Sequence, residues 1–253
     1  MSSPTTPVVF VHGVGLDRTM WDAVLSGLDG DRLLRYDMIG HGEASAPAGP
    51  YRLSDFVEQL AEFADEEELD HFDLVGFSMG ALVAQGFAAA HPTRVRRMVL
   101  LNSVFDRTLA EREAVIERVG DVRSGGYEAS IEAALSRWFS TDFATARPDV
   151  VHAVGRRLSA NDARAYADAY EVFATADAEI VHVAHTIAAP TLVVTGSEDL
   201  RSTPEMAHLL AAAMPDARAQ IIDGVRHLTP FECPIVVADL IQGFLSDASR
   251  EQG

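Results

Sequence analysis

Short apolar segments alternate with helical segments along most of this chain, and this alternation restricts the possible folds more than any other feature. Six apolar runs bounded by Gly, Asp or Pro are predicted to be buried strands, at residues 7–13, 32–37, 72–78, 95–103, 190–199 and 218–223. Helical patterns lie between them, at residues 53–69, 79–91 and 203–214. Strands that alternate with helices form a parallel sheet covered on both faces. We therefore expect an α/β fold.

The alternation is interrupted between about residues 105 and 187. This region is poor in strand patterns and contains helix-like segments such as AEREAVIERVGDV and SIEAALSRWF. We therefore predict a core made of residues 1–104 and 187–253, with residues 105–186 inserted as a helical cap after the fourth strand.

Ser78 lies between two glycines at the junction of a predicted strand and a predicted helix, in the segment LVGFSMGALVAQ. In this setting the turn forces the serine into a strained conformation, and side chains at Gly76 and Gly80 would clash across it. The amino end of the following helix directs free amides and a positive dipole at developing negative charge. We therefore predict that Ser78 is a nucleophile; the alternative is a structural loop serine.

A nucleophilic serine needs a general base, which is typically a histidine oriented by a carboxylate. Of nine histidines, His227 is the best candidate because it lies in a loop after the last predicted strand. The predicted carboxylate is Asp199, just past the preceding strand, with Glu198 or Asp223 as alternatives. Substrate sites of open α/β sheets lie at the carboxyl ends of the strands, where the three predicted residues fall.

An oxyanion that forms on the substrate needs two backbone amides. One is expected from Met79, which directly follows Ser78, and the other from Val14 in the segment HGVG after the first strand. His12 and His41 precede glycines in tight turns and are expected to brace loops. The pair His182 and His185 has a spacing that could hold a metal, but no acidic ligand pattern accompanies it. We predict neither a metal nor a cofactor.

Charge and cysteine content exclude several classes of protein. Twenty basic against 38 acidic residues give a formal charge of −18, which argues against nucleic acids and anionic membrane surfaces as partners. The single cysteine, Cys233, cannot form an internal disulfide. Residues 1–13 lack the basic and apolar regions of a signal peptide, and no segment has the length of a membrane span. We expect a cytoplasmic enzyme; monomer and homo-oligomer both remain open.

Taken together, the segments HGVG, RYDMIGHGEAS, GFSMG, GSEDLRSTP and GVRHLTPFECP resemble the α/β-hydrolase superfamily in their order and intervals. Within it the chain is most similar to 3-oxoadipate enol-lactonases, a similarity that extends to GLDRTMWD and to cap segments such as SRWFSTDFATARPDVV. The resemblance implies serine-ester chemistry on a small carboxylated enol-lactone, with no metal or cofactor. It also implies the Ser-Asp-His order that Ser78, Asp199 and His227 follow.

The chain departs from the family pattern at its first strand, which begins at Pro7 and leaves no room for the usual antiparallel hairpin. We therefore expect a mostly parallel sheet of six strands, flanked by helices, with residues 32–37 at an edge. There Arg32 and Arg35 would oppose pairing with another edge. The cap matches in pattern rather than identity, so the resemblance supports hydrolysis better than it supports one substrate.

Several activities share this fold. A serine at position 78 sets aside haloalkane dehalogenases, which need aspartate, and a cap rich in charged residues does not suit a lipase. A carbon–carbon bond hydrolase, a general carboxylesterase and a slow-turnover ligand sensor remain open. In the cap, Trp138 could form an apolar wall of the pocket, or it could anchor the cap helix. Arg137 could bind a substrate carboxylate, or it could be a surface arginine.

Overall fold

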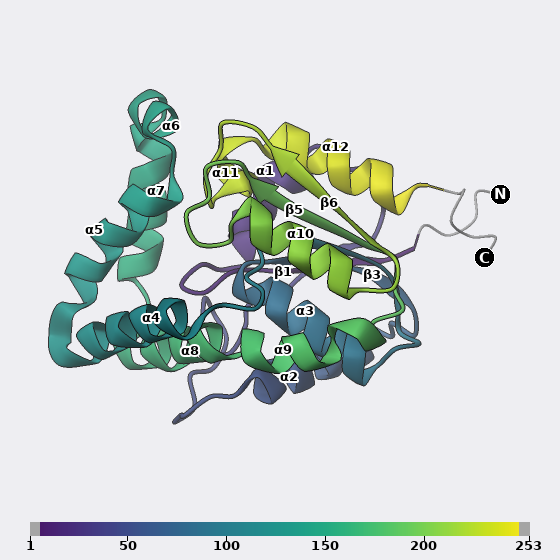
Figure 1. Cartoon of the computed structure of the whole chain (residues 1–253), viewed down its shortest axis with the longest axis horizontal. Helices are drawn as coiled ribbons and strands as arrows, with labels where there is room; N and C mark the ends of the chain where they lie inside the picture. Colours follow the sequence, from purple (N-terminus) through teal and green to yellow (C-terminus); the bar gives the residue numbers. More distant parts are fainter. Residues whose placement is uncertain (1–5, 248–253) are drawn as a thin grey trace.

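Six strands form a single sheet at the centre of the protein (Figure 1). The computed structural model describes residues 6–247. All neighbouring strands are parallel. They run in the order β2-β1-β3-β4-β5-β6 and comprise β1 (Val8–Val11), β2 (Leu33–Arg35), β3 (Phe72–Phe77), β4 (Val95–Leu101), β5 (Thr191–Gly196) and β6 (Ala217–Ile222). The predicted α/β fold with six strands is confirmed, and the sheet is parallel throughout.

The direction in which strands are added to the sheet reverses at β1. The chain places β2 on one side of β1 and then crosses back to place β3 on the other side. The loops that leave the carboxyl ends of β1 and β3 therefore diverge and open a crevice between them, which is where open α/β sheets bind their ligands.

The predicted position of residues 32–37 at an edge of the sheet is confirmed, although the strand is shorter than predicted. β2 has three residues, all half-buried, whereas β1 and β3 are buried throughout. The Arg32 guanidinium donates a hydrogen bond to the Glu67 carbonyl, and Arg35 pairs with Asp22. Both arginine side chains thus bind neighbouring segments. Their predicted role against edge pairing stays a prediction.

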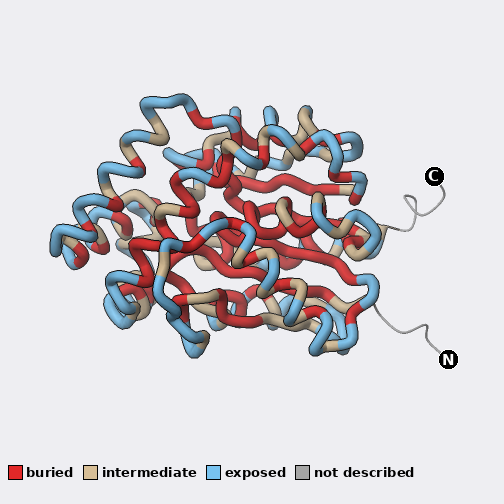
Figure 2. Tube along the Cα trace, turned by 90° about the horizontal axis from the view of Figure 1, so that it is seen from below, coloured by how far each residue is buried: buried red, intermediate tan, exposed pale blue. Residues whose placement is uncertain are grey.

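Helices cover both faces of the sheet. In Figure 1, α1 (Asp22–Leu25) and α12 (Pro234–Leu245) lie above it, whereas α2 (Leu53–Glu66) and α3 (Met79–Ala90) lie below it. α10 (Pro204–Ala213) packs against β5 and β6. It begins at Pro204, because the Thr203 hydroxyl accepts a hydrogen bond from the Met206 amide and proline suits the first turn of a helix. The buried strands appear as a continuous red core between these helices in Figure 2.

The chain between β4 and β5 contains no strand among the described residues. It forms α4 (Leu109–Asp121), a short π-helical segment η2 (Val122–Gly126), α5 (Tyr127–Trp138), α6 (Thr141–Ala146), α7 (Pro148–Ser159), α8 (Ala163–Thr175), α9 (Asp177–Val183) and the 3-10 turn η3 (Ala184–Thr186). α4 packs on α8 and α5 on α7, and Figure 1 shows this group beyond the end of the sheet that faces away from the termini. α9 instead packs on α3. The division at residues 105 and 186 stays a prediction.

The predictions about a membrane span and a signal peptide are tested to different extents. Within residues 6–247, no helix combines the length and the apolar character that crossing a membrane requires. The prediction about a signal peptide falls partly on residues 1–5, which lie outside the described residues.

Candidate active site

The serine between the two glycines occupies the predicted sharp turn. Ser78 directly follows β3 and has φ of +53° and ψ of −112°. Residues other than glycine rarely adopt this backbone conformation. A Cβ atom at Gly76 would lie 2.4 Å from the Gly80 carbonyl oxygen, and one at Gly80 would lie 2.3 Å from the Val11 carbonyl oxygen. Main-chain atoms come so close, from the turn itself at Gly76 and from the end of β1 at Gly80, that only glycine fits at either position.

Ser78, His227 and Asp199 form one hydrogen-bonded chain. The Ser78 Oγ lies 3.2 Å from His227 Nε2, and His227 Nδ1 lies 2.7 Å from Asp199 Oδ2. All three side chains are buried. Because an ionised carboxylate only accepts hydrogen bonds, Nδ1 carries the proton and Nε2 can accept one from the serine hydroxyl. The arrangement is therefore able to withdraw a proton from Ser78.

The two alternative carboxylates lie elsewhere. Glu198 is exposed and faces Arg226, while Asp223 is exposed and accepts a hydrogen bond from the Ser197 hydroxyl. Neither has a hydrogen bond to His227 within the described part of the chain. The structure thus brings together the three residues that the sequence singled out and leaves both alternatives apart.

The Asp199 carboxylate is held by three further donors. Its Oδ1 accepts the amides of Arg201 at 2.9 Å and Ser202 at 3.0 Å, and its Oδ2 accepts the Asn102 side-chain amide at 2.9 Å. Burial opposes ionisation of Asp199. The nearby His227 and the hydrogen bonds outweigh burial and keep the pKa of Asp199 below its ordinary value. The carboxylate is therefore ionised and fixed in place.

Asn102 is a site residue that the sequence reasoning missed. It follows β4 in the left-handed conformation, with φ of +51°, and its side chain is fully buried. Besides Asp199, its amide nitrogen donates to Thr195 Oγ1 at 3.2 Å, and its Oδ1 accepts the Thr229 hydroxyl at 2.6 Å. A polar residue directly after a buried apolar strand was the available clue, because that position lies at the carboxyl edge of the sheet.

The segment HGVG passes beside the serine. A Cβ atom at Gly13 would lie 3.3 Å from the Ser78 Cβ, and Val14 lines the same cavity as Ser78. Met79 is the first residue of α3, and amides in the first turn of a helix have no acceptor within that helix. The two residues predicted to supply amides therefore flank Ser78.

His12 braces this segment, as the sequence analysis expected. The ring is fully buried, its Nδ1 donates to the Gly13 carbonyl at 2.8 Å, and its Nε2 accepts the Met38 amide at 2.9 Å. Burial lowers the pKa of His12, and the hydrogen-bond pattern requires the neutral ring. His12 is a support beneath the loop, and its ring nitrogens are both engaged there.

The cavity above Ser78 is lined jointly by the core and the insertion. The predicted wall residue Trp138 lies there, with its ring centroid 5.9 Å from that of His227, and so does Arg137. The other lining residues are Val14, Arg107, Glu111, Val115, Arg118, Tyr170, Phe173, Arg201, Met206 and His227. Of the described residues, four arginines and one acidic residue, Glu111, thus line the cavity.

The arginines differ in how their charge is matched. Arg107 pairs with the buried carboxylate of Asp177, while Arg118 donates a hydrogen bond to the Tyr170 hydroxyl. Arg137 has no hydrogen bond or ion pair within residues 6–247. Burial and the charges of Arg118 and Arg201 lower the pKa of Arg137, against an opposite contribution from Tyr170. Cations that repel one another in a half-buried wall are stabilised by a bound anion.

Neither His182 nor His185 belongs to a cluster of potential metal ligands within the part of the chain that the structure describes. Over the described range, His, Cys, Asp and Glu side chains form no group of three or more that could hold a metal ion. His182 lies in α9 and His185 in the turn η3 that follows it.

Comparison with known proteins gives one consistent result. A model of the alpha/beta hydrolase fold matches residues 6–234. The (E)-2-((N-methylformamido)methylene)succinate hydrolase of Acinetobacter baylyi is 32% identical, over 94% of this chain and 90% of that protein. The 3-oxoadipate enol-lactonase 2 of the same organism is 26% identical, over 90% and 84%.

Solved structures agree. The crystal structure of the enol-lactonase from Burkholderia xenovorans LB400 superposes with a TM-score of 0.90 at 28% identity, over 97% of this chain and 93% of that one. The predicted resemblance to the superfamily and to enol-lactonases is confirmed. The family match spans most of the sequence, and the fold, the glycine-flanked serine and these relatives all agree with it, so the chain belongs to the alpha/beta hydrolase family.

Proposed function

We propose that this protein hydrolyses a small anionic carboxylic ester or lactone through an acyl-enzyme, with Ser78 as nucleophile, His227 as general base and Asp199 as its orienting carboxylate. The observation that carries the proposal is the hydrogen-bonded chain of these three residues at the base of an arginine-lined cavity. No metal or cofactor takes part in this chemistry.

The proposed reaction has two halves. Ser78 Oγ attacks the carbonyl carbon while its proton passes to His227 Nε2, and the amides of Met79 and Val14 stabilise the oxyanion. Collapse of the tetrahedral intermediate leaves an acyl-enzyme and returns the proton to the departing oxygen. In a lactone, that oxygen remains tethered to the acyl group. Water, deprotonated by His227, then releases the acid and regenerates Ser78.

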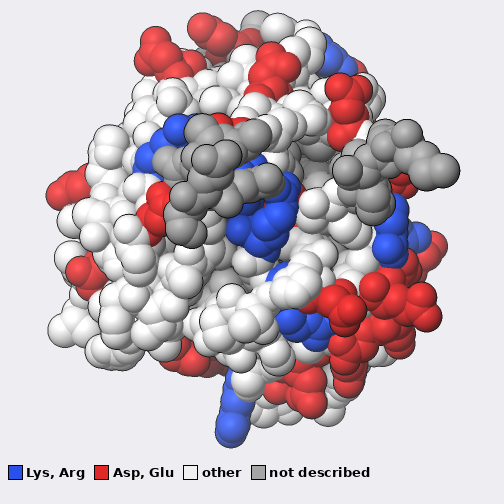
Figure 3. All heavy atoms as spheres, turned by 90° about the vertical axis from the view of Figure 1, so that its right-hand side faces the viewer, with Lys and Arg blue, Asp and Glu red and all other residues white. Residues whose placement is uncertain are grey.

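The charge of the cavity supports an anionic substrate. The whole protein carries a formal charge of −18, and acidic side chains gather along one edge of the face shown in Figure 3. The cavity has the opposite sign, since Glu111 is the acidic residue among four arginines in its lining, and Arg118, Arg137 and Arg201 form no ion pair within the described residues. Because the negative charge of the whole protein repels anions, a carboxylated substrate needs a cationic binding site. Guanidinium groups bind carboxylates well.

A second candidate is cleavage of a different bond in a substituted succinate. The Acinetobacter baylyi relative is named as a hydrolase of such a compound, and it aligns along nearly the whole chain. The same serine chemistry could serve that reaction, and the cationic cavity suits either substrate. Carbon–carbon cleavage and a slow-turnover sensor use the same residues, so steady-state turnover on defined esters, lactones and acylated succinates separates these possibilities.

Ser78→Ala tests the nucleophile. The variant should lose several orders of magnitude in turnover of p-nitrophenyl esters while its thermal unfolding stays close to wild type, because only the attacking oxygen is removed. A serine-directed phosphonate should label the wild-type chain once, at Ser78. Full activity in the variant, or a label on another residue, would refute the proposal.

Arg137→Ala tests the substrate class, with Arg156→Ala as its control. Arg156 is an exposed cap arginine that does not line the cavity. Anionic lactones should exceed neutral esters of equal size in kcat/KM. Loss of Arg137 should raise the KM for anions about 10-fold or more and affect kcat less, because a contact remote from the carbonyl binds substrate and transition state alike. If neutral esters exceed anionic lactones in the wild type and the Arg137 variant is unchanged, a general carboxylesterase with the same three residues remains.

A further inference from the structure

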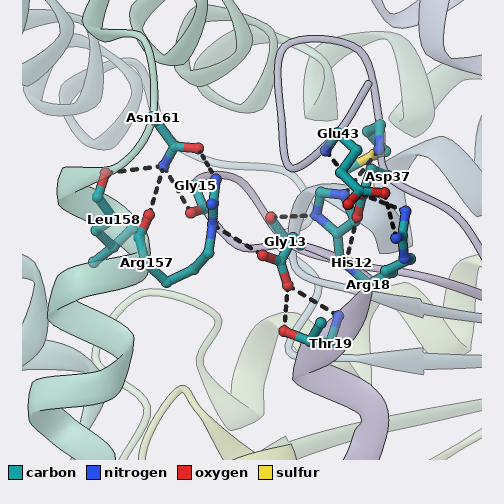
Figure 4. A network of polar contacts seen from close by, with 12 residues as sticks. His12, Gly13, Gly15, Arg18, Thr19, Asp37, Glu43, Arg157, Leu158 and Asn161 are labelled. Carbon is teal, nitrogen blue, oxygen red and sulfur yellow. Dashed lines mark hydrogen bonds and ion pairs between the residues drawn. The ribbon is translucent and has the colours of Figure 1, made fainter. Parts of the chain in front are cut away.

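The loop that follows β1 is held from two sides (Figure 4). We call residues 12–17 the β1 loop. On the sheet side, His12 donates to the Gly13 carbonyl, and the Asp37 carboxylate accepts the amide of Arg18, just beyond the loop, at 2.7 Å. The Arg18 guanidinium adds a second contact to Asp37 at 2.9 Å. These supports come from the core of the protein.

On the other side, the support comes from the insertion. Asn161, between α7 and α8, donates from Nδ2 to the Gly15 carbonyl at 2.8 Å. The Arg157 guanidinium donates to Asn161 Oδ1, and its Nε lies 3.1 Å from the Asp17 carboxylate. Asn161 Nδ2 also lies 3.0 Å from the Leu158 carbonyl, so its side chain is fixed at the end of α7.

The end of α7 and the start of α8, on either side of Asn161, pack directly on Gly15. A Cβ atom there would lie 2.6 Å from Leu158 Cδ2 and 2.7 Å from Tyr166 Cε2. Val14 and Gly15 are the central residues of a turn closed by the hydrogen bond from the Leu16 amide to the Gly13 carbonyl, at 3.2 Å. Gly15 has φ of +78°, which the third position of a type II turn requires. The Gly15 carbonyl shares a planar peptide group with the Leu16 amide, and the Gly13 carbonyl that accepts this amide shares one with the Val14 amide. Holding the Gly15 carbonyl therefore helps to fix the direction of the Val14 amide.

We propose that Asn161 is a positioning residue. Through it, the packing of the insertion (residues 105–186) on the β1 loop fixes the oxyanion site. By holding the Gly15 carbonyl, it keeps the Val14 amide aimed at the oxyanion, and Arg157 and Asp17 hold Asn161 in turn. The inference rests on the proposed function, because it assigns the Val14 amide to the transition state. It predicts that the cap contributes to the rate of the reaction as well as to the selection of substrate.

The test uses Asn161→Ala and Asn161→Asp with p-nitrophenyl acetate as substrate. Removing one oxyanion donor outright costs about 10²- to 10³-fold in kcat, so a misdirected donor should cost about 10- to 100-fold. The aspartate variant should be the slower of the two, because its carboxylate would face the Gly15 carbonyl oxygen. KM should change by less than about 3-fold, because the hydrogen bond from Asn161 to the Gly15 carbonyl affects the transition state rather than the bound substrate.

Two readouts separate positioning from a general structural effect. Phenylboronic acid forms a tetrahedral adduct with a nucleophilic serine, so its inhibition constant should rise by the same factor as kcat falls. The pH profile of kcat/KM should keep its shape, because Asn161 does not contact His227. Asp149→Asn, which removes the exposed Arg147–Asp149 ion pair at the other end of α7, is the matched control and should match wild type.

Asp17→Asn provides a second variant in case the Asn161 variants fold poorly. Asparagine can still accept the Thr19 amide at the start of η1 (Arg18–Trp21), but it no longer pairs with Arg157. It should lower kcat and boronate affinity together, by a smaller factor. Unchanged kcat in folded Asn161 and Asp17 variants, or a rise in KM alone, would overturn the coupling. An active Ser78→Ala enzyme would instead overturn the proposed function itself.

Discussion

Replacing Asn102 tests how firmly the candidate carboxylate is held. Asn102→Ala removes the side-chain amide that donates to Asp199 Oδ2 at 2.9 Å. It also leaves the buried Thr229 hydroxyl, which donates to Asn102 Oδ1 at 2.6 Å, without that acceptor. Finally, it places alanine at φ of +51°, a conformation that asparagine tolerates better.

The expected loss of stability follows from these three changes. A hydrogen bond to a charged group contributes about 1.5–3 kcal/mol, and a buried polar group left unpaired costs about 1–3 kcal/mol. The left-handed conformation costs a residue other than glycine or asparagine about 1 kcal/mol or more. We therefore expect Asn102→Ala to lower the free energy of unfolding by about 4 kcal/mol, a large share of the roughly 5–15 kcal/mol typical of domains.

Urea unfolding at pH 7 measures this loss, with Thr229→Val as the matched variant. Valine removes only the donor to Asn102 Oδ1 and should cost about 1–2 kcal/mol. Turnover of Asn102→Ala should fall only about 10-fold, because the amides of Arg201 and Ser202 still hold the Asp199 carboxylate. A loss of stability below about 1 kcal/mol, or equal losses in the two variants, would refute this account of Asn102.

Two further predictions concern other buried groups. Asp199→Asn should lower kcat by about 10³- to 10⁴-fold, because asparagine neither favours the Nδ1–H tautomer of His227 nor stabilises its protonated ring. Glu198→Gln should leave kcat nearly unchanged. The opposite ranking of the two variants would count against Asp199. Burial lowers the pKa of His41 to about 3. In the unfolded chain, His41 therefore binds a proton at pH values where the folded protein keeps its ring neutral. The free energy of unfolding falls as the pH drops below 6.5, the ordinary pKa of histidine. Between pH 7 and pH 5, wild type should lose about 2 kcal/mol more than His41→Asn in urea unfolding; equal losses would contradict this.

Local patterns were sufficient to predict the fold and the main candidate residues. Alternating apolar and helical segments specify a parallel sheet, because each strand must be covered on both faces. The glycines around Ser78 mark the sharp turn, and the positions of Asp199 and His227 after strands place them at one edge of the sheet. These inferences need only the order of segments along the chain, since parallel strands bring their carboxyl ends together.

The contacts that complete the site could not be predicted from sequence. Asn102 and Asp199 are 97 residues apart, and Asn161 and Gly15 are 146 apart, so no local pattern links either pair. Nor did the sequence decide whether Arg137 faces solvent or the cavity, because an arginine at the end of a helix suits both places. Local chemistry along the chain determined which groups could react. Only the tertiary packing, of strand ends beside one another in the sheet and of the insertion on the sheet, decided which side chains hold them, because those contacts depend on distances in space that sequence separation does not encode.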